Sequence, residues 1–403
     1  MKWPVEMVPF ELALDDETPG QTKVQRSDYL ADGAVPVIDQ GQKAVAGYTN
    51  DPGLAYEGPL PVILFGDHTL LFKHVDFPFA LGADGVRALT AKPPFLSKFL
   101  FYYLTSVRIA SRGYSRHFKF LREVRFPHIA EKEQRRIVEL LEQADGLRRK
   151  RAEADTLADR IMPALFHKMF GDPATNPKGW PRVRLETVIA DTRNGLYKHA
   201  DFYGRGTQIL KMFNILSGRL NLERVDRVEL DADELAAYRL EVGDILVNRV
   251  NTPELVGKCA VIPTELGEAV FESKNIRLRL KADVAEPNYV AHFLNTGFGH
   301  ATLCQGVKHA IGMATINNSD VRNCRLPVPP IAKQQEWATH VAAIRKLAAQ
   351  ADAARANLER LFQFLLHRAF TGELTAEWRE AHLKELLAEM EQQARLLNVK
   401  QEA

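Results

Sequence analysis

Cationic side chains are most concentrated between Arg108 and Arg125, where they alternate with aromatic rings and meet a single acid, Glu123. Guanidinium and ammonium groups neutralise phosphates, so this segment predicts a local footprint for nucleic acid. Arg112 and Arg116 have the donor geometry that engages guanine edges. The alternative is a basic helix face that meets an acidic protein. The candidate contacts in this segment are Arg112, Tyr114, Arg116, His117 and Lys119.

Other polar side chains fall in expected loops of both halves of the chain. Arg, Lys, Asn and Gln make the usual contacts with bases and phosphates, but any one of them is equally well interpreted as a solvated loop residue. They are therefore candidates only as sets. The first-half set is Gln40, Gln42, Lys43, His68 and Lys73. The second-half set is Arg193, Asn194, Lys198, Lys211, Asn214, Arg249, Asn251, Lys274, Lys308 and His309, with Asn317 and Asn318 as weaker members.

Motifs for enzyme chemistry are missing from the sequence or incomplete. No Asn-Pro-Pro-aromatic tetrapeptide is present to hold a flipped adenine, and no G-x-x-x-x-G-K-[ST] loop is present to bind ATP. Asp244 with Glu272-Ser273-Lys274 imitates the D…E-x-K arrangement that binds Mg²⁺, but such triplets are frequent by chance. Asp67-His68 has no third metal ligand at a suitable spacing. The sequence therefore predicts no catalytic residue, no metal site and no cofactor in this chain.

Composition limits the class of protein. The 403 residues predict two to three domains, and 46% hydrophobic with 26% charged residues is ordinary for a globular protein. The net charge of +2 is near balance, so any affinity for a polyanion must come from local patches. Three cysteines without a C-x-x-C pair exclude a disulfide scaffold. With no long apolar run and no signal-peptide pattern, we expect a soluble, cytoplasmic protein.

The chain repeats itself at an offset of 200 residues, so that Ser115–Phe170 resembles Thr315–Phe370. A duplication of this size indicates two equivalent units in one chain, and hence something that is read twice. The best-matched pairs are Arg125 and Arg325, Pro127 and Pro327, Gln134 and Gln334, Leu147 and Leu347, Ala154 and Ala354, Leu165 and Leu365, His167 and His367, and Phe170 and Phe370.

Each repeat predicts a strand end, a proline-rich entry and a long helix. Apolar or small residues recur at steps of 3 and 4 from Ala144 to Leu165 and again 200 residues later, the pattern of a coiled-coil seam. A helix from about Glu133 to Phe170 is about 55 Å long and cannot bury its own stripe, so we expect the two stripes to pack on each other. Pro163, which Gln363 replaces in the second repeat, predicts a break near Met162 in one helix only.

The segments before the two helices alternate short apolar runs with Gly and Pro turns. Strands are expected at Leu60–Gly66 and Gly243–Asn248, and helices near Leu96–Thr105 and Asn288–Leu294. Gly297-Phe298-Gly299 lacks the third glycine of a dinucleotide-binding motif and is interpreted as a turn. The pattern is that of two mixed α/β domains, each followed by a long helix.

Taken in order, these motifs resemble the specificity (S) subunit of type I restriction-modification enzymes over nearly the whole chain. The motifs are the duplicated Pro-Ile-Ala-x-Gln type of helix entry, Trp180-Pro181-x-Val183-x-Leu185, Gly243-Asp244-Ile245-Leu246 and the ending from His367 to Thr375. Each is weak alone, but the ordered, duplicated set is specific. The first repeat departs from the pattern where Ile129 and Ala130 replace the paired Pro329 and Pro330.

The resemblance implies a mixed α/β (α+β) fold with a pseudo-twofold internal repeat, in which two target recognition domains are separated by an antiparallel coiled coil. The expected division is 1–124 for the first recognition domain, 125–172 for the first spacer helix, 173–324 for the second recognition domain, 325–375 for the second spacer helix and 376–403 for a C-terminal helical extension. Each recognition domain is expected to read one half of a split, asymmetric DNA site.

The resemblance also implies partners and a role in DNA methylation and phage defence. The helices are expected to dock two methyltransferase (M) subunits, with two restriction (R) subunits as possible further members. S-adenosylmethionine, ATP and Mg²⁺ are expected on those partners. A rod of about 50 Å corresponds to some 15 base pairs, enough to hold two readers in successive major grooves, and one inserted heptad should lengthen the tolerated spacer. The alternatives are a self-contained nuclease or methyltransferase with a degenerate site, and a coiled-coil scaffold that binds protein.

Overall fold

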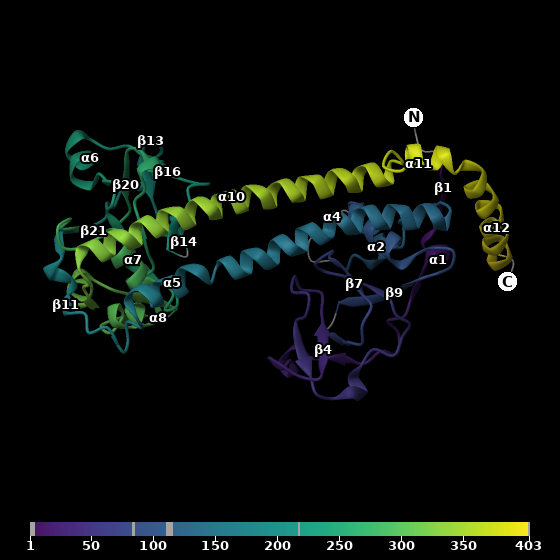
Figure 1. The fold of residues 1–403 in the computed structure, drawn as a ribbon, viewed down its shortest axis with the longest axis horizontal. Helices are drawn as coiled ribbons and strands as arrows, with labels where there is room; N and C mark the ends of the chain where they lie inside the picture. The colour runs from purple at the N-terminus through teal and green to yellow at the C-terminus, as the bar shows by residue number, and fades with distance from the viewer. Residues whose placement is uncertain (1–4, 83–84, 110–115, 217, 311, 402–403) are drawn as a thin grey trace. The chain divides into compact units, whose positions relative to one another are not determined.

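The computed structural model describes residues 5–82, 85–109, 116–216, 218–310 and 312–401, and the chain folds as two compact units. Unit 1 comprises Met1–Glu153 with Asp352–Ala403, and unit 2 comprises Ala154–Ala351. Strands and helices are present in both units (Figure 1), so the expected mixed α/β content is confirmed. In the part of the chain that the structure describes, no helix is long and apolar enough to cross a membrane.

Unit 1 contains two four-stranded sheets, in the orders β2-β9-β6-β7 and β3-β8-β4-β5, and the pair β1-β10. The central strand β6 is buried on both faces: Val62 and Leu64 enter one hydrophobic core, while Ile63 and Phe65 enter another that includes helix α2. The elements are β1 (Glu6–Val8), α1 (Phe10–Ala13), β2 (Leu14–Asp16), β3 (Lys23–Val24), β4 (Val35–Ile38), β5 (Gly47–Thr49), β6 (Val62–Gly66), β7 (Phe72–Val75), β8 (Ala80–Gly82), β9 (Val86–Ala91), α2 (Ser97–Ser106), α3 (Phe118–Leu121) and β10 (Phe126–His128).

Unit 2 is built around the sheet β12-β21-β17-β19, with the three-stranded sheets β16-β13-β20 and β18-β23-β22 beside the pairs β14-β15 and β11-β24. Its strand β17 alternates as β6 does, because Ile245 and Val247 enter one core and Leu246 another. Its strands are β11 (Arg182–Arg184), β12 (Ile189–Asn194), β13 (Tyr203–Leu210), β14 (Ile215–Leu216), β15 (Arg219–Leu220), β16 (Asp226–Val228), β17 (Ile245–Asn248), β18 (Val250–Asn251), β19 (Cys259–Val261), β20 (Ala269–Phe271), β21 (Asn275–Leu280), β22 (Lys308–Ala310), β23 (Met313–Thr315) and β24 (Arg325–Pro327).

The short helices of unit 2 are α6 (Ala232–Tyr238), α7 (Pro287–Asn295), α8 (Gly297–Leu303) and α9 (Asn318–Asn323). The helices expected near Leu96–Thr105 and Asn288–Leu294 are confirmed as α2 and α7. The turn expected at Gly297-Phe298-Gly299 is wrong, because these residues begin α8. Gly299 is required there, since a Cβ at this position would lie 1.9 Å from the carbonyl oxygen of Phe293.

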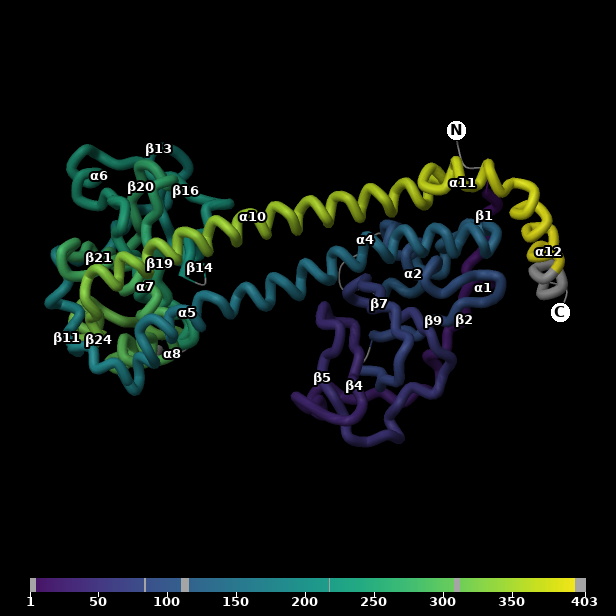
Figure 2. The backbone as a smooth tube through the Cα atoms, viewed as in Figure 1, coloured from purple at the N-terminus to yellow at the C-terminus, as the bar shows by residue number. Residues whose placement is uncertain are grey.

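The long helices differ in continuity, as Pro163 predicts. The first repeat forms α4 (Glu131–Ala158) and α5 (Ile161–Phe170) with a break at 159–160, whereas the second forms the single helix α10 (Ile331–Phe370) (Figure 2). Because the break precedes Met162, Pro163 falls in the first turn of α5, where its missing N–H removes no helical hydrogen bond.

A buried glutamine at the start of each long helix makes the same three hydrogen bonds. The Gln134 amide donates to the carbonyl oxygens of Ile129 and Pro94 at 2.9 and 3.2 Å, and its Oε1 accepts from the N–H of Leu96 at 2.8 Å. Leu96 caps the start of α2, so the amide joins the long helix to the short one.

In unit 2 the geometry recurs. The Gln334 amide donates to the carbonyl oxygens of Pro329 and Val284 at 2.7 and 3.3 Å, and its Oε1 accepts from the N–H of Glu286, the residue that caps α7, at 3.0 Å. Both glutamines have 0% exposure. We call this arrangement the glutamine clamp.

Each clamp is followed by a buried helical stripe. In unit 1, Ile137, Leu141 and Ala144 of α4 share a core with Phe362 and Leu366 of α10. The guanidinium of Arg148 also bonds Glu359 Oε2 at 2.6 Å and lies 4.2 Å from the centre of the Phe362 ring.

In unit 2, Trp337 at the start of α10 is fully buried against Phe166 and Phe170 of α5, with ring centroids 5.2 and 6.1 Å apart. Farther along the stripes Leu147 is 51% and Leu347 64% exposed. Helix-on-helix packing is thus established within each unit, over the residues that follow the clamp.

The chain ends in two helices of unit 1, α11 (Ala376–Ala381) and α12 (Leu383–Gln401). They anchor at the first turn of α4, where the carboxylate of Glu133, 3% exposed, accepts hydrogen bonds from Thr375 Oγ1 at 2.6 Å and Arg379 Nε at 2.7 Å. Lys132 adds an ion pair with Glu385 at 2.8 Å. A buried carboxylate needs such partners, so this contact ties the end of the chain to the first helix entry.

The clamp makes a testable prediction. Replacing Gln134 or Gln334 with Leu keeps the volume but leaves a buried N–H and two carbonyl groups without partners, so each variant should lower the free energy of unfolding by about 3 kcal/mol. Thermal or urea unfolding measures this loss. Gln335→Leu, at the exposed neighbouring position, is the matched control and should change little. Equal stabilities of Gln334→Leu and Gln335→Leu would contradict the structural role of the clamp.

Candidate nucleic-acid interface

Several loops of unit 2 meet at one edge of its central sheet. Asn194 at the end of β12 pairs with Ile276, and Asn248 at the end of β17 pairs with Asn275, so both strands end where β21 begins. The neighbouring sheet reaches the same edge, since Val250 pairs with Thr315 and Thr315 with Lys308. We call this edge, with residues 193–197, 249–252 and 272–274, the unit 2 edge.

Buried asparagines hold the unit 2 edge together. Asn248 donates from its amide to the carbonyl oxygen of Lys274 at 3.0 Å and accepts from the Asn251 amide at 2.8 Å. Asn251 Oδ1 then accepts from the N–H of Thr252 at 2.9 Å. Asn248 has 0% and Asn251 7% exposure. The side chain of Asn251, a predicted DNA contact, is therefore buried and hydrogen-bonded within the unit.

Four predicted candidates present polar atoms at the unit 2 edge. Arg193, Asn194 and Lys274 are exposed, and the Arg193 guanidinium lies 5.6 Å from the centre of the Tyr238 ring. Arg249 is half-buried, and its Nε has no hydrogen-bond partner among the described residues. Lys308 and His309 are placed by backbone only, in β22 next to β23.

Three other candidates of unit 2 are engaged internally. Lys198 forms an ion pair with Glu234 at 2.6 Å. Lys211 forms one with Asp226 at 2.7 Å, and this hydrogen bond lowers the pKa of the Asp226 carboxyl below its ordinary value. Asn214, with 0% exposure, donates its amide to the carbonyl oxygens of Asn221 and Arg224. Asn214 therefore shapes its own loop, and the two lysines are balanced by acids.

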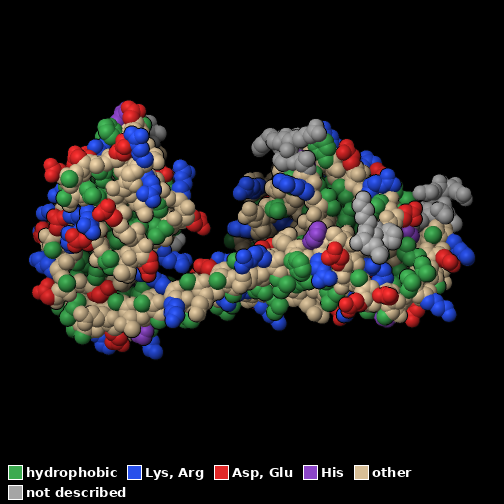
Figure 3. Space-filling model, turned by 90° about the horizontal axis from the view of Figure 1, so that it is seen from above, with side chains coloured by type: hydrophobic (Ala, Val, Ile, Leu, Met, Phe, Trp, Pro, Cys, Tyr) green, Lys and Arg blue, Asp and Glu red, His purple; other side chains and the backbone are tan. Residues whose placement is uncertain are grey.

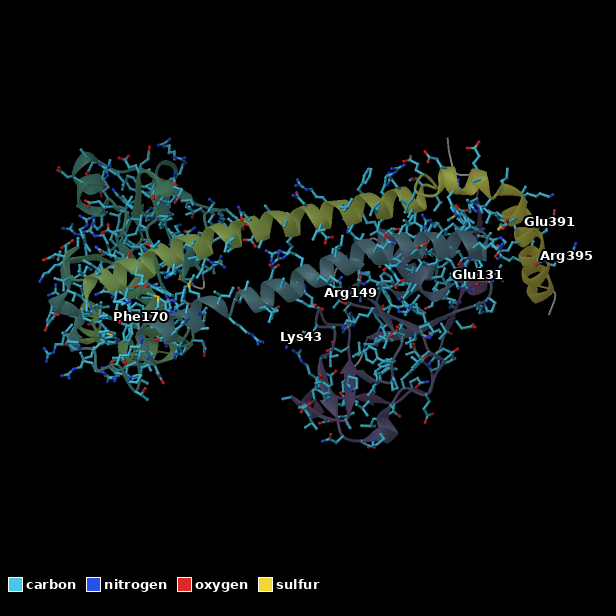
Figure 4. All side chains as sticks on the ribbon, viewed as in Figure 1. Lys43, Glu131, Arg149, Phe170, Glu391 and Arg395 are labelled. Carbon is cyan, nitrogen blue, oxygen red and sulfur yellow. The ribbon has the colours of Figure 1, made fainter. Side chains whose placement is uncertain are left out.

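The first-half candidates of unit 1 gather around one loop junction. Gln40 Oε1 accepts from the N–H of His68 at 3.2 Å, and Lys73 Nζ donates to the carbonyl oxygens of Asp39 and Lys43 at 2.7 and 2.6 Å. Burial lowers the pKa of Lys73, and these two hydrogen bonds commit its ammonium to holding the loop. Gln42, Lys43 and His68 are exposed, and Lys43 extends away from the globular part of the unit (Figure 4).

The basic segment of the sequence reaches the same junction. His117, 1% exposed, places its Nδ1 2.9 Å from the carbonyl oxygen of Asp67, and the Asp67 carboxylate accepts from the N–H of Phe118 at 2.7 Å. Arg116 and Lys119 are exposed beside it. Arg112 and Tyr114 lie outside the described residues. We call the exposed set Gln42, Lys43, His68, Arg116 and Lys119 the unit 1 junction.

The residues that match the D…E-x-K pattern of a nuclease do not lie close together in the structure. Asp244 is 3% exposed and binds the Arg279 guanidinium through both oxygens at 2.8 and 2.9 Å. Because β17 and β21 are antiparallel, Asp244 lies opposite Arg279, and Asp244 and Lys274 are at opposite ends of the pair, about 17 Å apart. Among the described residues no three His, Cys, Asp or Glu side chains are placed to hold a metal ion.

Charge on the surface agrees with the near-neutral composition. On the face seen in Figure 3, Lys and Arg side chains are interspersed with Asp and Glu side chains. Any footprint for a polyanion is therefore local, at loops such as the unit 1 junction and the unit 2 edge.

Sequence reasoning missed Tyr197, whose side chain is 81% exposed at the unit 2 edge. The available signal was its position in Asn194-Gly195-Leu196-Tyr197-Lys198, between two predicted candidates. An aromatic residue in a strand-rich segment is normally interpreted as core, and only the burial of its neighbour Leu196 shows which of the two points outward.

The known proteins that are similar to this chain are specificity subunits of type I restriction enzymes. No family model matches the chain. The type I restriction enzyme EcoKI specificity subunit of Escherichia coli (strain K12) is 30% identical over 207 residues, which are 49% of this chain and 44% of that protein. The StySPI specificity subunit of Salmonella potsdam is 30% identical over 209 residues, 50% of this chain and 44% of that protein. The match thus spans less than half the length of these curated relatives.

Solved structures show the same fold over most of the chain. The type I restriction-modification S subunit from M. genitalium covers 91% of this chain with a TM-score of 0.55 at 12% identity, and 96% of its own chain is matched. A chain from a study of complex assembly and conformational transition of the type I R-M system covers 93% with a TM-score of 0.51 at 18% identity, matched over 96% of its length. The resemblance to type I specificity subunits is therefore confirmed.

The exposed cations make the second prediction. Arg116→Ala in the unit 1 junction and Lys274→Ala in the unit 2 edge should each weaken binding to duplex DNA and reduce the slope of log K against log salt by about 1, because each removes one neutralised phosphate. Titration of a fluorescent duplex at several salt concentrations measures the slope. Lys384→Ala, an exposed lysine on α12, is the control. A slope unchanged in both variants, or equally reduced by Lys384→Ala, would argue against these two footprints.

Proposed function

We propose that this chain is the DNA-specificity subunit of a type I restriction-modification complex, and that it reads a bipartite, asymmetric DNA site with one α/β domain for each half. The observation that carries the proposal is the glutamine clamp. An equivalent buried amide fixes a long helix to each of two α/β domains, whose four-stranded sheets share one strand order while their smaller sheets differ. The same helix attachment on two domains that share the main sheet but differ in their smaller sheets suits a split site with unlike halves.

The spacer is proposed to be an antiparallel coiled coil of α4–α5 with α10. Support comes from the seam pattern of the sequence, the helix packing inside each unit, and the continuous 40 residues of α10. Under this proposal the expected division into recognition domains and spacer helices holds, and helix length sets the distance between the two half-sites.

Catalysis is assigned to partners. The chain is proposed to bind double-stranded DNA and two M subunits, with two R subunits as possible further members, and to act in the cytoplasm. Methylation of adenine with S-adenosylmethionine, and cleavage with ATP and Mg²⁺, belong to those subunits. Support comes from the missing motifs and from the separation of Asp244 and Lys274, which leaves the nuclease alternative without an assembled site.

The third prediction tests this function directly. Deleting the gene in its host should abolish methylation at one bipartite sequence motif and leave other methylated motifs intact, because only the specificity subunit carries the site information. Methylome sequencing with and without the gene measures this, and complementation with the intact gene is the control. An unchanged methylome in a host that expresses the protein would refute the proposal. A neighbouring reading frame with N-P-P-[FY] is also expected.

A further inference from the structure

We infer that Tyr197 is a specificity-determining residue of the second half-site, whose ring packs against base edges of duplex DNA at the unit 2 edge. This inference rests on the proposed function. Among the large hydrophobic side chains of the described residues, Tyr197 has the largest exposed fraction, 81%, followed by Leu347 and Val242 at 64%. A solvated aromatic ring carries a large apolar area that a partner can bury at little conformational cost.

The backbone that presents Tyr197 is fixed on both sides. Leu196 is 4% exposed, donates its N–H to the carbonyl oxygen of Phe271 at 2.8 Å and accepts from the N–H of Ser273 at 2.8 Å. Gly195 donates to the carbonyl oxygen of Asn275 at 3.0 Å, and a Cβ there would lie 2.1 Å from the carbonyl oxygen of Glu272. The two chain segments therefore cross in direct contact, and only glycine fits the crossing.

On the other side of Tyr197, Lys198 is held by its ion pair with Glu234 at 2.6 Å. The side chain of residue 197 thus projects from a segment whose neighbours are both immobilised. A preorganised ring loses little freedom on binding, which is the property of an aromatic anchor at an interface rather than of a mobile loop tip.

The charged residues at the unit 2 edge favour a polyanion, rather than an apolar protein surface, as the partner of the Tyr197 ring. Arg193 and Lys274 are exposed at the same edge, and among the described residues no acid forms an ion pair with either. The acids nearby are already engaged: Glu272 Oε1 accepts from the N–H of Met212 at 2.7 Å, and Asp226 binds Lys211. Cations that meet phosphates at the same edge as a projecting ring favour contact of that ring with base edges in the groove.

The ring also suits the chemistry of base edges. In the major groove an apolar group contacts the thymine methyl. Asn194 at the same edge has an exposed amide of the type that matches adenine, and its Oδ1 also accepts from the Asn318 amide at 3.3 Å. Loss of one good base contact costs about tenfold in discrimination. The role assigned to Tyr197 is therefore selectivity within one half-site, distinct from the general phosphate attraction of Lys274.

The test uses the complete complex with its M subunits and duplexes that carry single-base changes in either half-site. Tyr197→Ala should lower the ratio of specific to non-specific affinity about tenfold, with the loss confined to changes in the second half-site. Tyr197→Phe, which keeps the ring, should retain the ratio. Val242→Ala is the matched control: it is 64% exposed but lies before β17, at the end of that strand opposite the unit 2 edge.

The outcomes separate the inference from the proposed function. If the wild-type complex distinguishes no bipartite site, the proposed function fails. If the wild type discriminates and Tyr197→Ala discriminates equally well, only the role of Tyr197 is overturned. A loss in Tyr197→Phe as large as in Tyr197→Ala, or an equal loss in Val242→Ala, overturns the ring contact as well. An unchanged melting temperature of Tyr197→Ala confirms that the exposed position does not affect folding.

Discussion

The structure depends on the hydrogen bonds of two buried side-chain amides, Gln134 and Gln334. Each amide satisfies a backbone N–H and a carbonyl oxygen at the start of a short helix, and one carbonyl oxygen of the chain that leads into a long helix. Buried backbone groups of this kind cannot form hydrogen bonds with water instead. Separating the long helix from its domain would therefore cost a large free energy. The clamp therefore fixes the direction of a helix that contacts its own domain over only a few turns.

This constraint explains which parts of the repeat remained similar. The clamp needs one glutamine and the backbone of the segments at 94–96 and 129, or at 284–286 and 329, and it makes no demand on the smaller sheets of the domain. The two units accordingly share the helix entry and the order of the four-stranded sheet, β2-β9-β6-β7 and β12-β21-β17-β19, but differ in their smaller sheets, β3-β8-β4-β5 in one and β16-β13-β20 with β18-β23-β22 in the other. A recognition surface can diverge freely on such a domain while the spacer geometry is kept.

Local sequence patterns were sufficient for the elements but not for the roles of polar side chains. Strands β6 and β17, helices α2 and α7 and the break before Pro163 follow from apolar runs and proline, which act over a few residues. The burial of Asn214, Asn251 and His117 depends on partners that the fold brings together, such as the carbonyl oxygen of Asp67, 50 residues from His117. No local pattern distinguishes an asparagine that braces a loop from one that meets a base.

Internal contacts of the cationic side chains also decide how a nearly neutral protein can bind a polyanion. Where Lys198, Lys211 and Lys73 are held by acids or carbonyl groups of their own unit, their charges organise loops and contribute little to a distant field. The cations that remain exposed, among them Arg116, Lys119, Arg193 and Lys274, lie beside loops that these internal contacts hold in place. Few free charges on preorganised loops favour selectivity over general affinity, because non-specific attraction grows with the number of phosphates neutralised, whereas base readout depends on fixed geometry.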